Sequence, residues 1–135
     1  MNGVLIINKP QGWTSHDVVN KARRILQVKQ IGHTGTLDPL ATGVLVLCIG
    51  KATKIVRYLE ADDKEYTAAL KLGVTTDTQD ADGKILEARV YAPPTVGEIQ
   101  DVLNAFQGSI RQRPPAFSAL KVNGVPSYRM ARQGT

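Results

Sequence analysis

Asp38 is the only carboxylate in a loop, residues 32–43, that otherwise holds glycine, hydroxyl and apolar side chains around one histidine. Pro39 disfavours the α region for Asp38 and keeps that residue extended or in a turn. A single acid on such a loop suits a nucleophile or a general base. The structural alternative is that Asp38 caps the short turn 39–41, with proline at its first position. The loop by itself leaves both interpretations open.

Glycines are expected to set the conformation of this loop. Gly32, Gly35 and Gly43 are predicted to allow positive φ and the close approach of a ligand. His33 lies among them as a titratable neighbour of Asp38. The loop therefore combines an acid with a backbone that a ligand can approach.

The composition narrows the class of protein. A chain of 135 residues with 42% hydrophobic content can bury one core without a disulfide or a metal. Cys48 is the only cysteine, and His16 and His33 lack metal-ligand spacing. The apolar run 4–7 is too short for a signal peptide or a membrane span and predicts a strand. We therefore expect a cytoplasmic protein with no membrane segment, no metal and no cofactor.

Charge is divided into three blocks, although the net charge is only +5. Residues 1–60 carry eight Lys/Arg against three Asp/Glu, residues 61–105 carry four against nine, and residues 106–135 carry five and no acid. Surface charge by itself explains solubility. A basic patch formed by the two ends would also suit a polyanion such as RNA.

The first sixty residues predict two strands and two helices around the loop. Buried strands are expected at 3–8 and 43–49, the second of them central in its sheet. A turn at 9–12 leads to a helix over 16–27 that Thr14 or Ser15 caps, and a second helix follows over 51–60. The inward residues are expected to be Val18, Val19, Ala22, Ile25 and Leu26, then Ile55, Val56 and Leu59, with Lys21, Arg23 and Arg24 on the polar face of the first helix.

The remaining residues predict short strands and two more helices. Strands are expected at 65–72, 85–91, 109–112 and 117–122, with a polar loop at 75–83. A capping box at 95–98 opens a helix that Gly108 ends, and a short basic helix covers 127–133. The inward residues of the capped helix are expected to be Val96, Ile99, Val102, Leu103 and Phe106. This order of elements, without regular βα alternation, predicts an α+β fold with a mixed, mainly antiparallel sheet flanked by helices.

Three motifs together resemble one known family. They are Asn-Lys-Pro-Gln-Gly-Trp-Thr-Ser at 8–15, the loop at 32–43, and the pair Pro-Pro-Ala-Phe-Ser-Ala-Leu-Lys at 114–121 and Tyr-Arg-Met-Ala-Arg-Gln-Gly at 128–134. The sequence resembles the TruB family, the transfer-RNA pseudouridine synthase B enzymes, from about residue 3 to its last residue. The twelve-residue loop is long and specific, whereas the Lys-Pro-Gln-Gly turn alone would be a weak signal.

The resemblance implies a pseudouridine synthase fold and an isomerase that acts on the T-loop uridine of tRNA (position 55 in tRNA nomenclature). Uracil is detached from C1′, turned and rejoined through C5, which needs no metal and no redox change. By resemblance Asp38 is the catalytic residue, either attacking C1′ or abstracting the C2′ proton.

Three further residues match positions that the family uses at its substrate. Tyr66 would stack on the flipped uracil and relay a proton, and its alternative is a core tyrosine. His33 would lie beside the flipped nucleotide, or would only stabilise the loop by a hydrogen bond. Asp80 would bond a base or sugar, because a carboxylate repels phosphate.

The resemblance also assigns supporting and RNA-binding residues. Lys9, Pro10, Gly35 and Pro39 would support the site structurally. The basic tail resembles the start of the thumb element that pinches the T-loop, and its phosphate contacts would be Arg111, Arg113, Lys121, Arg129 and Arg132. Their alternative is a solvated surface.

The resemblance further implies that residues 1–135 are the N-terminal part of a catalytic domain. The rest of that domain, with an arginine that pairs with the aspartate, and a small C-terminal RNA-binding domain are expected beyond Thr135. The full-length protein is expected to be a monomer, and this chain alone to self-associate through an open sheet edge. Two alternatives stay open: an RNA-binding but catalytically incomplete fragment, and a guide-RNA-dependent relative.

Charge reversal at Arg129 and Arg132 tests the role of the basic tail. We expect weaker RNA binding and a slope of log affinity against log salt that flattens by at most about two, roughly one per lost phosphate contact. The measurement is a salt titration of binding to a T-stem-loop RNA. An unchanged slope would mean that both side chains are only solvated.

Overall fold

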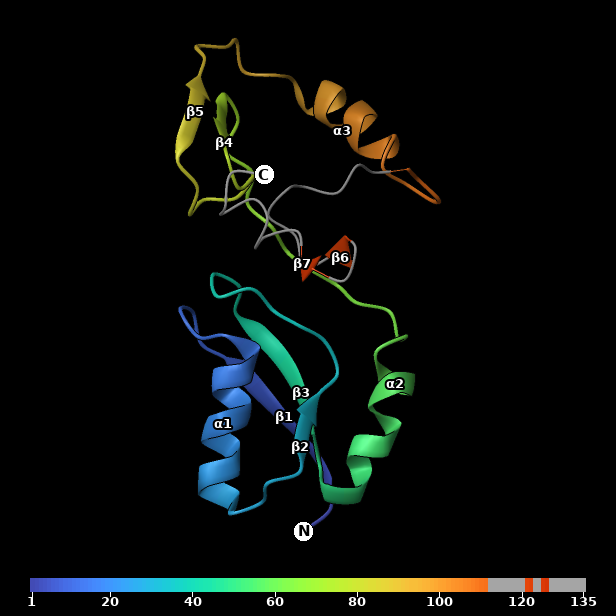
Figure 1. Cartoon of the computed structure of the whole chain (residues 1–135). Coiled ribbons are helices and arrows are strands. Elements are labelled where there is room, and N and C mark those ends of the chain that lie inside the picture. The colour runs from blue at the N-terminus through green and yellow to red at the C-terminus, as the bar shows by residue number, and fades with distance from the viewer. Residues whose placement is uncertain (112–120, 123–124, 127–135) are drawn as a thin grey trace. The chain divides into compact units, whose positions relative to one another are not determined.

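The computed structural model describes residues 1–111, 121–122 and 125–126, and divides into two compact units, Met1–Thr67 and Ala68–Thr135 (Figure 1). Each unit contains its own antiparallel strand pairs. This agrees with the predicted α+β class and its mainly antiparallel pairing.

The sheet of the first unit has the order β1-β3-β2, with both pairs antiparallel. Its strands are β1 at Gly3–Lys9, β2 at Ile31–His33 and β3 at Gly43–Ile49. The central place of β3 is confirmed, whereas the short β2 was not predicted. Because Lys9 pairs with Gly43, the turn after β1 starts opposite the end of the Asp38 loop. The register thus brings the motif at 8–15 next to the loop at 32–43.

Helix α1, Ser15–Leu26, is capped by Thr14 and not by Ser15, which is its first residue. The Asp17 N–H donates to Thr14 Oγ1 (3.1 Å) and the Thr14 N–H donates to Asp17 Oδ2 (2.9 Å). The hydrogen bonds from Thr14 lower the pKa of the Asp17 carboxyl. The cap therefore favours charged Asp17, and it loses this support as the pH falls through that lowered pKa.

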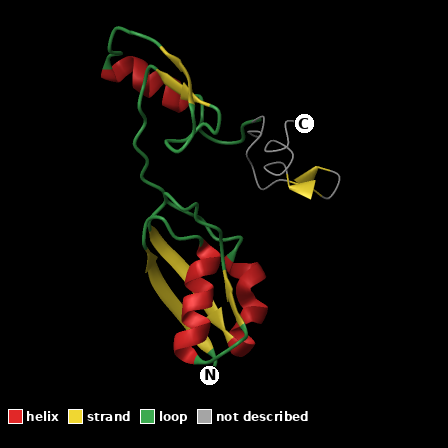
Figure 2. Cartoon of the chain, turned by 60° about the vertical axis from the view of Figure 1, so that its left-hand side comes forward, coloured by secondary structure: helices red, strands yellow, loops and turns green. Residues whose placement is uncertain are grey.

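One face of the sheet packs against α1, which Figure 2 shows lying across the strands. Ile25, predicted to face inward, is 67% exposed. Arg23, predicted to lie on the polar face, reaches back to β2 and donates from Nη2 to the Ile31 carbonyl (3.0 Å). The buried core consists of Val18, Val19, Ala22, Ile31, Leu45, Leu47 and Ile49.

The other face is covered only in part among the described residues. A 3₁₀ helix, η1 at Gly50–Ile55, continues as α2 at Val56–Leu59 and replaces the single predicted helix. Gly32, the partner of Cys48 in the sheet, lies under α2, since a Cβ there would be 3.8 Å from Val56 Cγ2. Away from α2, the described residues leave Val4, Ile6 and Val44 of this face exposed. The predictions of buried strands and an inward Ile55 were therefore wrong at Val4, Ile6, Val44 and Ile55, which are exposed.

The predicted strand 65–72 was also wrong. Residues 63–71 have no regular secondary structure, although their side-chain pattern alternates. A strand must satisfy its N–H and C=O groups against a neighbour, and none of the described strands pairs with this segment. The alternating pattern is present, but no strand in the described part of the chain is its partner.

The second unit contains a hairpin of β4, Val74–Thr76, and β5, Ile85–Ala88, with an irregularity at Thr75/Thr76. Helix α3, Val96–Asn104, begins with the predicted capping box but ends before Gly108. Strand β6, Lys121–Val122, pairs with β7, Val125–Pro126. No strand forms over 109–111, and the predicted helix 127–133 lies outside the described residues.

The expected inward face of α3 is exposed. Nothing among the described residues buries Val96, Ile99, Val102, Leu103 or Phe106. An amphipathic pattern predicts which face can be buried, whereas burial itself needs a second element. Over the described residues, no helix has the length and apolar content to cross a membrane.

Cys48 reports on the integrity of the sheet. Its side chain is 0% exposed, and burial raises the pKa of its thiol. We expect iodoacetamide at mildly alkaline pH to leave the native chain unmodified and to alkylate it in guanidinium chloride, because the thiolate is the reactive form. Intact mass reads the result. Rapid alkylation of the native chain would contradict the burial of Cys48 in β3.

Candidate functional site

Asp38 lies in a tight turn at the far end of the loop. The Ala41 N–H donates to the Asp38 carbonyl (3.0 Å), so the main chain closes the turn. The turn of the structural alternative is present, but its closing bond uses the Asp38 carbonyl and not its side chain. Asp38 is exposed, so its carboxylate is open to a substrate.

The residue after Asp38 is held by the turn that follows β1. The Pro39 carbonyl accepts from the Gly12 N–H (2.8 Å) and from Lys9 Nζ (3.3 Å). Gly12 has φ +82°, a conformation that L side chains rarely adopt, and so places its N–H there without strain. The 9–12 turn therefore fixes one flank of Asp38.

Lys9 is 0% exposed, which is rare for a lysine. Besides Pro39, its Nζ donates to the carbonyls of Pro10 (3.0 Å) and Trp13 (2.6 Å). Three carbonyls thus use the three donors of the ammonium group. These contacts are of the kind expected for a residue that supports a site rather than one that reacts.

The residue before Asp38 is held by a side chain to which the sequence assigned only a capping role. Ser15 is 3% exposed, and its Oγ accepts from the Leu37 N–H (2.9 Å) and donates to the Leu37 carbonyl (3.2 Å). The pair Thr14-Ser15 could have indicated this contact in the sequence. One hydroxyl suffices for the helix cap, so the other is free to bond elsewhere.

The glycines play different parts from those predicted. Gly43 does adopt positive φ (+111°), but Gly32 and Gly35 do not. The Gly35 N–H donates to His33 Nδ1 (3.4 Å), which is the loop-stabilising bond considered for this histidine. His33 therefore has a structural contact, and its second ring nitrogen is not used in that bond.

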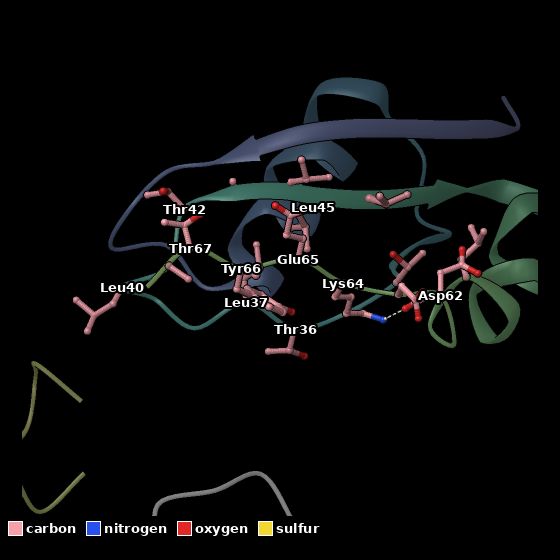
Figure 3. A pocket seen from close by; sticks show the side chains of 18 residues that line it. Thr36, Leu37, Leu40, Thr42, Leu45, Asp62, Lys64, Glu65, Tyr66 and Thr67 are labelled. Carbon is pink, nitrogen blue, oxygen red and sulfur yellow. Dashed lines mark hydrogen bonds between the residues drawn. The ribbon is translucent and has the colours of Figure 1, made fainter. Parts of the chain in front are cut away.

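A cavity of about 820 Å³ lies beside the Asp38 turn, within the first unit (Figure 3). Leu37 and Leu40, which flank Asp38 and Pro39, line it, whereas Asp38, Pro39 and His33 do not. Tyr66 also lines it and is 66% exposed, so it is not a core tyrosine. The full lining is Thr34–Leu37, Leu40–Val46, Leu59 and Asp62–Thr67.

The side chains that line this cavity are acidic on balance. Three acids, Asp62, Asp63 and Glu65, here called its acidic rim, line it together with one cation, Lys64. Lys64 Nζ donates to the carbonyls of Glu60 (2.7 Å) and Asp62 (2.8 Å), the second of which is drawn as a dashed line in Figure 3. An acidic rim repels phosphate and accepts hydrogen bonds from neutral donors, so this cavity suits a base or a sugar better than a phosphate.

The other predicted residues belong to the second unit or lie outside the described residues. Asp80 belongs to the second unit, where its Oδ1 accepts from Thr78 Oγ1 (2.6 Å) and from the Asp82 N–H (2.9 Å). Arg111 is exposed in the same unit. The side chains of Arg113, Lys121, Arg129 and Arg132 lie outside the described residues. Within the described part of the chain, no group of three His, Cys, Asp or Glu side chains could hold a metal ion.

Comparisons with known proteins point to one family. The model of the TruB family pseudouridylate synthases (N terminal domain) matches residues 23–135. A protein named tRNA pseudouridine synthase B from Opitutus terrae is 52% identical over 99% of this chain and 56% of its own length. The protein of that name from Geotalea uraniireducens is 51% identical over 99% of this chain and 43% of its own length. The chain thus spans about half the length of these curated relatives.

A solved structure that is similar to this chain covers most of it. It is the crystal structure of a Cbf5-Nop10-Gar1 complex, with a TM-score of 0.59 and 31% identity over 88% of this chain and 31% of the matched chain.

Lys9→Met tests the buried ammonium. The substitution keeps a long apolar stem but leaves three carbonyls without their donor, so we expect the free energy of unfolding to fall by about 2 kcal/mol or more. Denaturant titration measures it. The matched control is Lys21→Met on the exposed side of α1, expected to change stability by less than about 0.5 kcal/mol. Equal effects of the two substitutions would contradict the role of Lys9.

Proposed function

Since this chain belongs to the TruB family of pseudouridylate synthases, we propose that it supplies the catalytic aspartate of a tRNA pseudouridine synthase. The substrate we propose is the uridine of the tRNA T-loop, flipped out of its stack. The observation that carries this proposal is the exposed Asp38 carboxylate, on a turn held at both flanks and beside a cavity of about 820 Å³.

The reaction is an isomerisation and needs no other reactant. The bond from C1′ to N1 of uracil breaks and a bond from C1′ to C5 forms. N1 gains a proton and C5 loses one, so atoms and charge balance. A carboxylate is competent to attack C1′ or to take the C2′ proton, and the proposal includes either role for Asp38.

The cavity would receive the flipped uridine. Tyr66 lines it with an exposed ring, which suits stacking on a base. The hydroxyls of Thr34, Thr36 and Thr42 line it too and are suited to bond uracil or ribose. His33 would lie beside the nucleotide while its Nδ1 holds the loop.

Backbone phosphates would be bound elsewhere, because the cavity rim is acidic. We assign this task to the basic tail, with Arg111, Arg113, Lys121, Arg129 and Arg132 as candidates. Asp80 would contact a base or sugar. The RNA element bound would then be a T-stem-loop, and the full-length protein would be a monomer. The buried free thiol of Cys48 suits a reducing cytoplasm.

The named relatives support a tRNA enzyme. Two proteins named tRNA pseudouridine synthase B are 52% and 51% identical to this chain over 99% of its length. The alternative possibility, a fragment that binds RNA without turnover, is an outcome of the experiment below.

Asp38→Asn in a full-length protein that carries these residues tests the proposal. We expect near-normal affinity for a T-stem-loop and no tritium release from 5-tritiated uridine, because the amide neither attacks C1′ nor takes a proton. Turnover within about tenfold of the parent would overturn the assignment of Asp38.

The matched control is Asp101→Asn, the same substitution at an exposed position of α3. It should leave turnover unchanged. A parent protein that binds the stem-loop but releases no tritium would instead support the RNA-binding alternative.

A further inference from the structure

We propose that Ser15 is a positioning residue for Asp38, acting through the main chain of Leu37. Its hydroxyl bonds both polar groups of Leu37, accepting from the N–H (2.9 Å) and donating to the carbonyl (3.2 Å). In a paired strand, the N–H and carbonyl of Leu37 would bond the neighbouring strand, whereas here they bond the Ser15 hydroxyl. The inference rests on the proposed function, because it concerns the residue that would react.

The two flanks of Asp38 are held by different groups of one segment. Ser15 holds Leu37, and the Gly12 N–H and Lys9 Nζ hold the Pro39 carbonyl. With both neighbours fixed, the backbone of Asp38 has little freedom. The position of the carboxylate then depends on the rotamer of a short side chain alone.

Ser15 is well placed to carry this constraint because it is anchored itself. It is the first residue of α1, whose residues Val18 and Val19 belong to the buried core. At 3% exposure, its hydroxyl has little access to water. The contact therefore links the rigid core to the loop, and it spans 22 residues of sequence.

Loss of this hydroxyl should affect the chemical step more than binding. The Leu37 N–H and carbonyl would lose their protein partner, and the turn would gain freedom. A carboxylate displaced by about 1 Å can cost a hundredfold in rate, since the reacting atoms must be aligned. RNA affinity comes mainly from phosphate contacts spread over the molecule, so it depends little on one loop.

Thr14→Ala provides a matched control at the adjacent residue. It removes the helix cap, with its bonds to Asp17, but leaves both bonds to Leu37 intact. Both variants remove one hydroxyl from the start of α1. A purely structural role for Ser15 predicts the same behaviour for the two variants, whereas a positioning role predicts different behaviour.

The experiment compares Ser15→Ala, Ser15→Cys and Thr14→Ala in a full-length protein that carries these residues. Steady-state turnover of a T-stem-loop RNA gives kcat and KM, and hydrogen exchange by NMR reads the Leu37 amide. We expect Ser15→Ala to lower kcat by about tenfold to a hundredfold with KM within about twofold. The Leu37 amide should exchange faster in Ser15→Ala but not in Thr14→Ala.

Ser15→Cys keeps a side chain of similar shape with a weaker hydrogen-bonding group, and should fall between the parent and Ser15→Ala. It provides the comparison if Ser15→Ala does not fold. A kcat for the Ser15 variants no lower than that of Thr14→Ala would overturn the proposal, as would an unchanged Leu37 exchange rate. Failure of the proposed function would show differently, as an inactive parent in which Ser15→Ala still accelerates Leu37 exchange.

Discussion

The arrangement around Asp38 depends on one buried ammonium group. Lys9 is 0% exposed and donates to the carbonyls of Pro10, Trp13 and Pro39. Burying a charge is costly unless hydrogen bonds replace its hydration, and here three carbonyls must converge to do so. They converge only if the turn after β1 and the Asp38 turn lie side by side. The charge therefore stabilises one relative placement of the two turns.

The sheet makes this convergence possible. Pairing of Lys9 with Gly43 brings the end of β1 to the start of β3, and the core under α1 keeps both strands in place. Ser15 then adds a contact from the first residue of α1. Three features fix the same few residues: the register of the sheet, the buried Lys9 and the start of α1. The turn that carries the exposed acid is therefore held by buried residues.

Under the proposed function, different charges would bind the base and the phosphates of the RNA. The cavity beside Asp38 has an acidic rim, with Asp62, Asp63 and Glu65 in its lining. Acids there disfavour phosphate and leave a place for a neutral base. The five Lys/Arg of residues 106–135, a block without any acid, would then be the phosphate contacts. A base would thus enter an acidic cavity while cationic residues hold its backbone.

The sequence by itself determined the features that depend on neighbouring residues. The capping box at Thr95, a cap at Thr14 or Ser15 and the central strand β3 follow from patterns within a few positions. The Asp38 loop was recognised because twelve consecutive residues carry its signature. Only the tertiary structure decided the contacts of Ser15 with Leu37 and of Lys9 with Pro39, which span 22 and 30 residues. It also decided that α3 and residues 65–72 have no covering or pairing element among the described residues, because burial and strand pairing need a partner that no local pattern specifies.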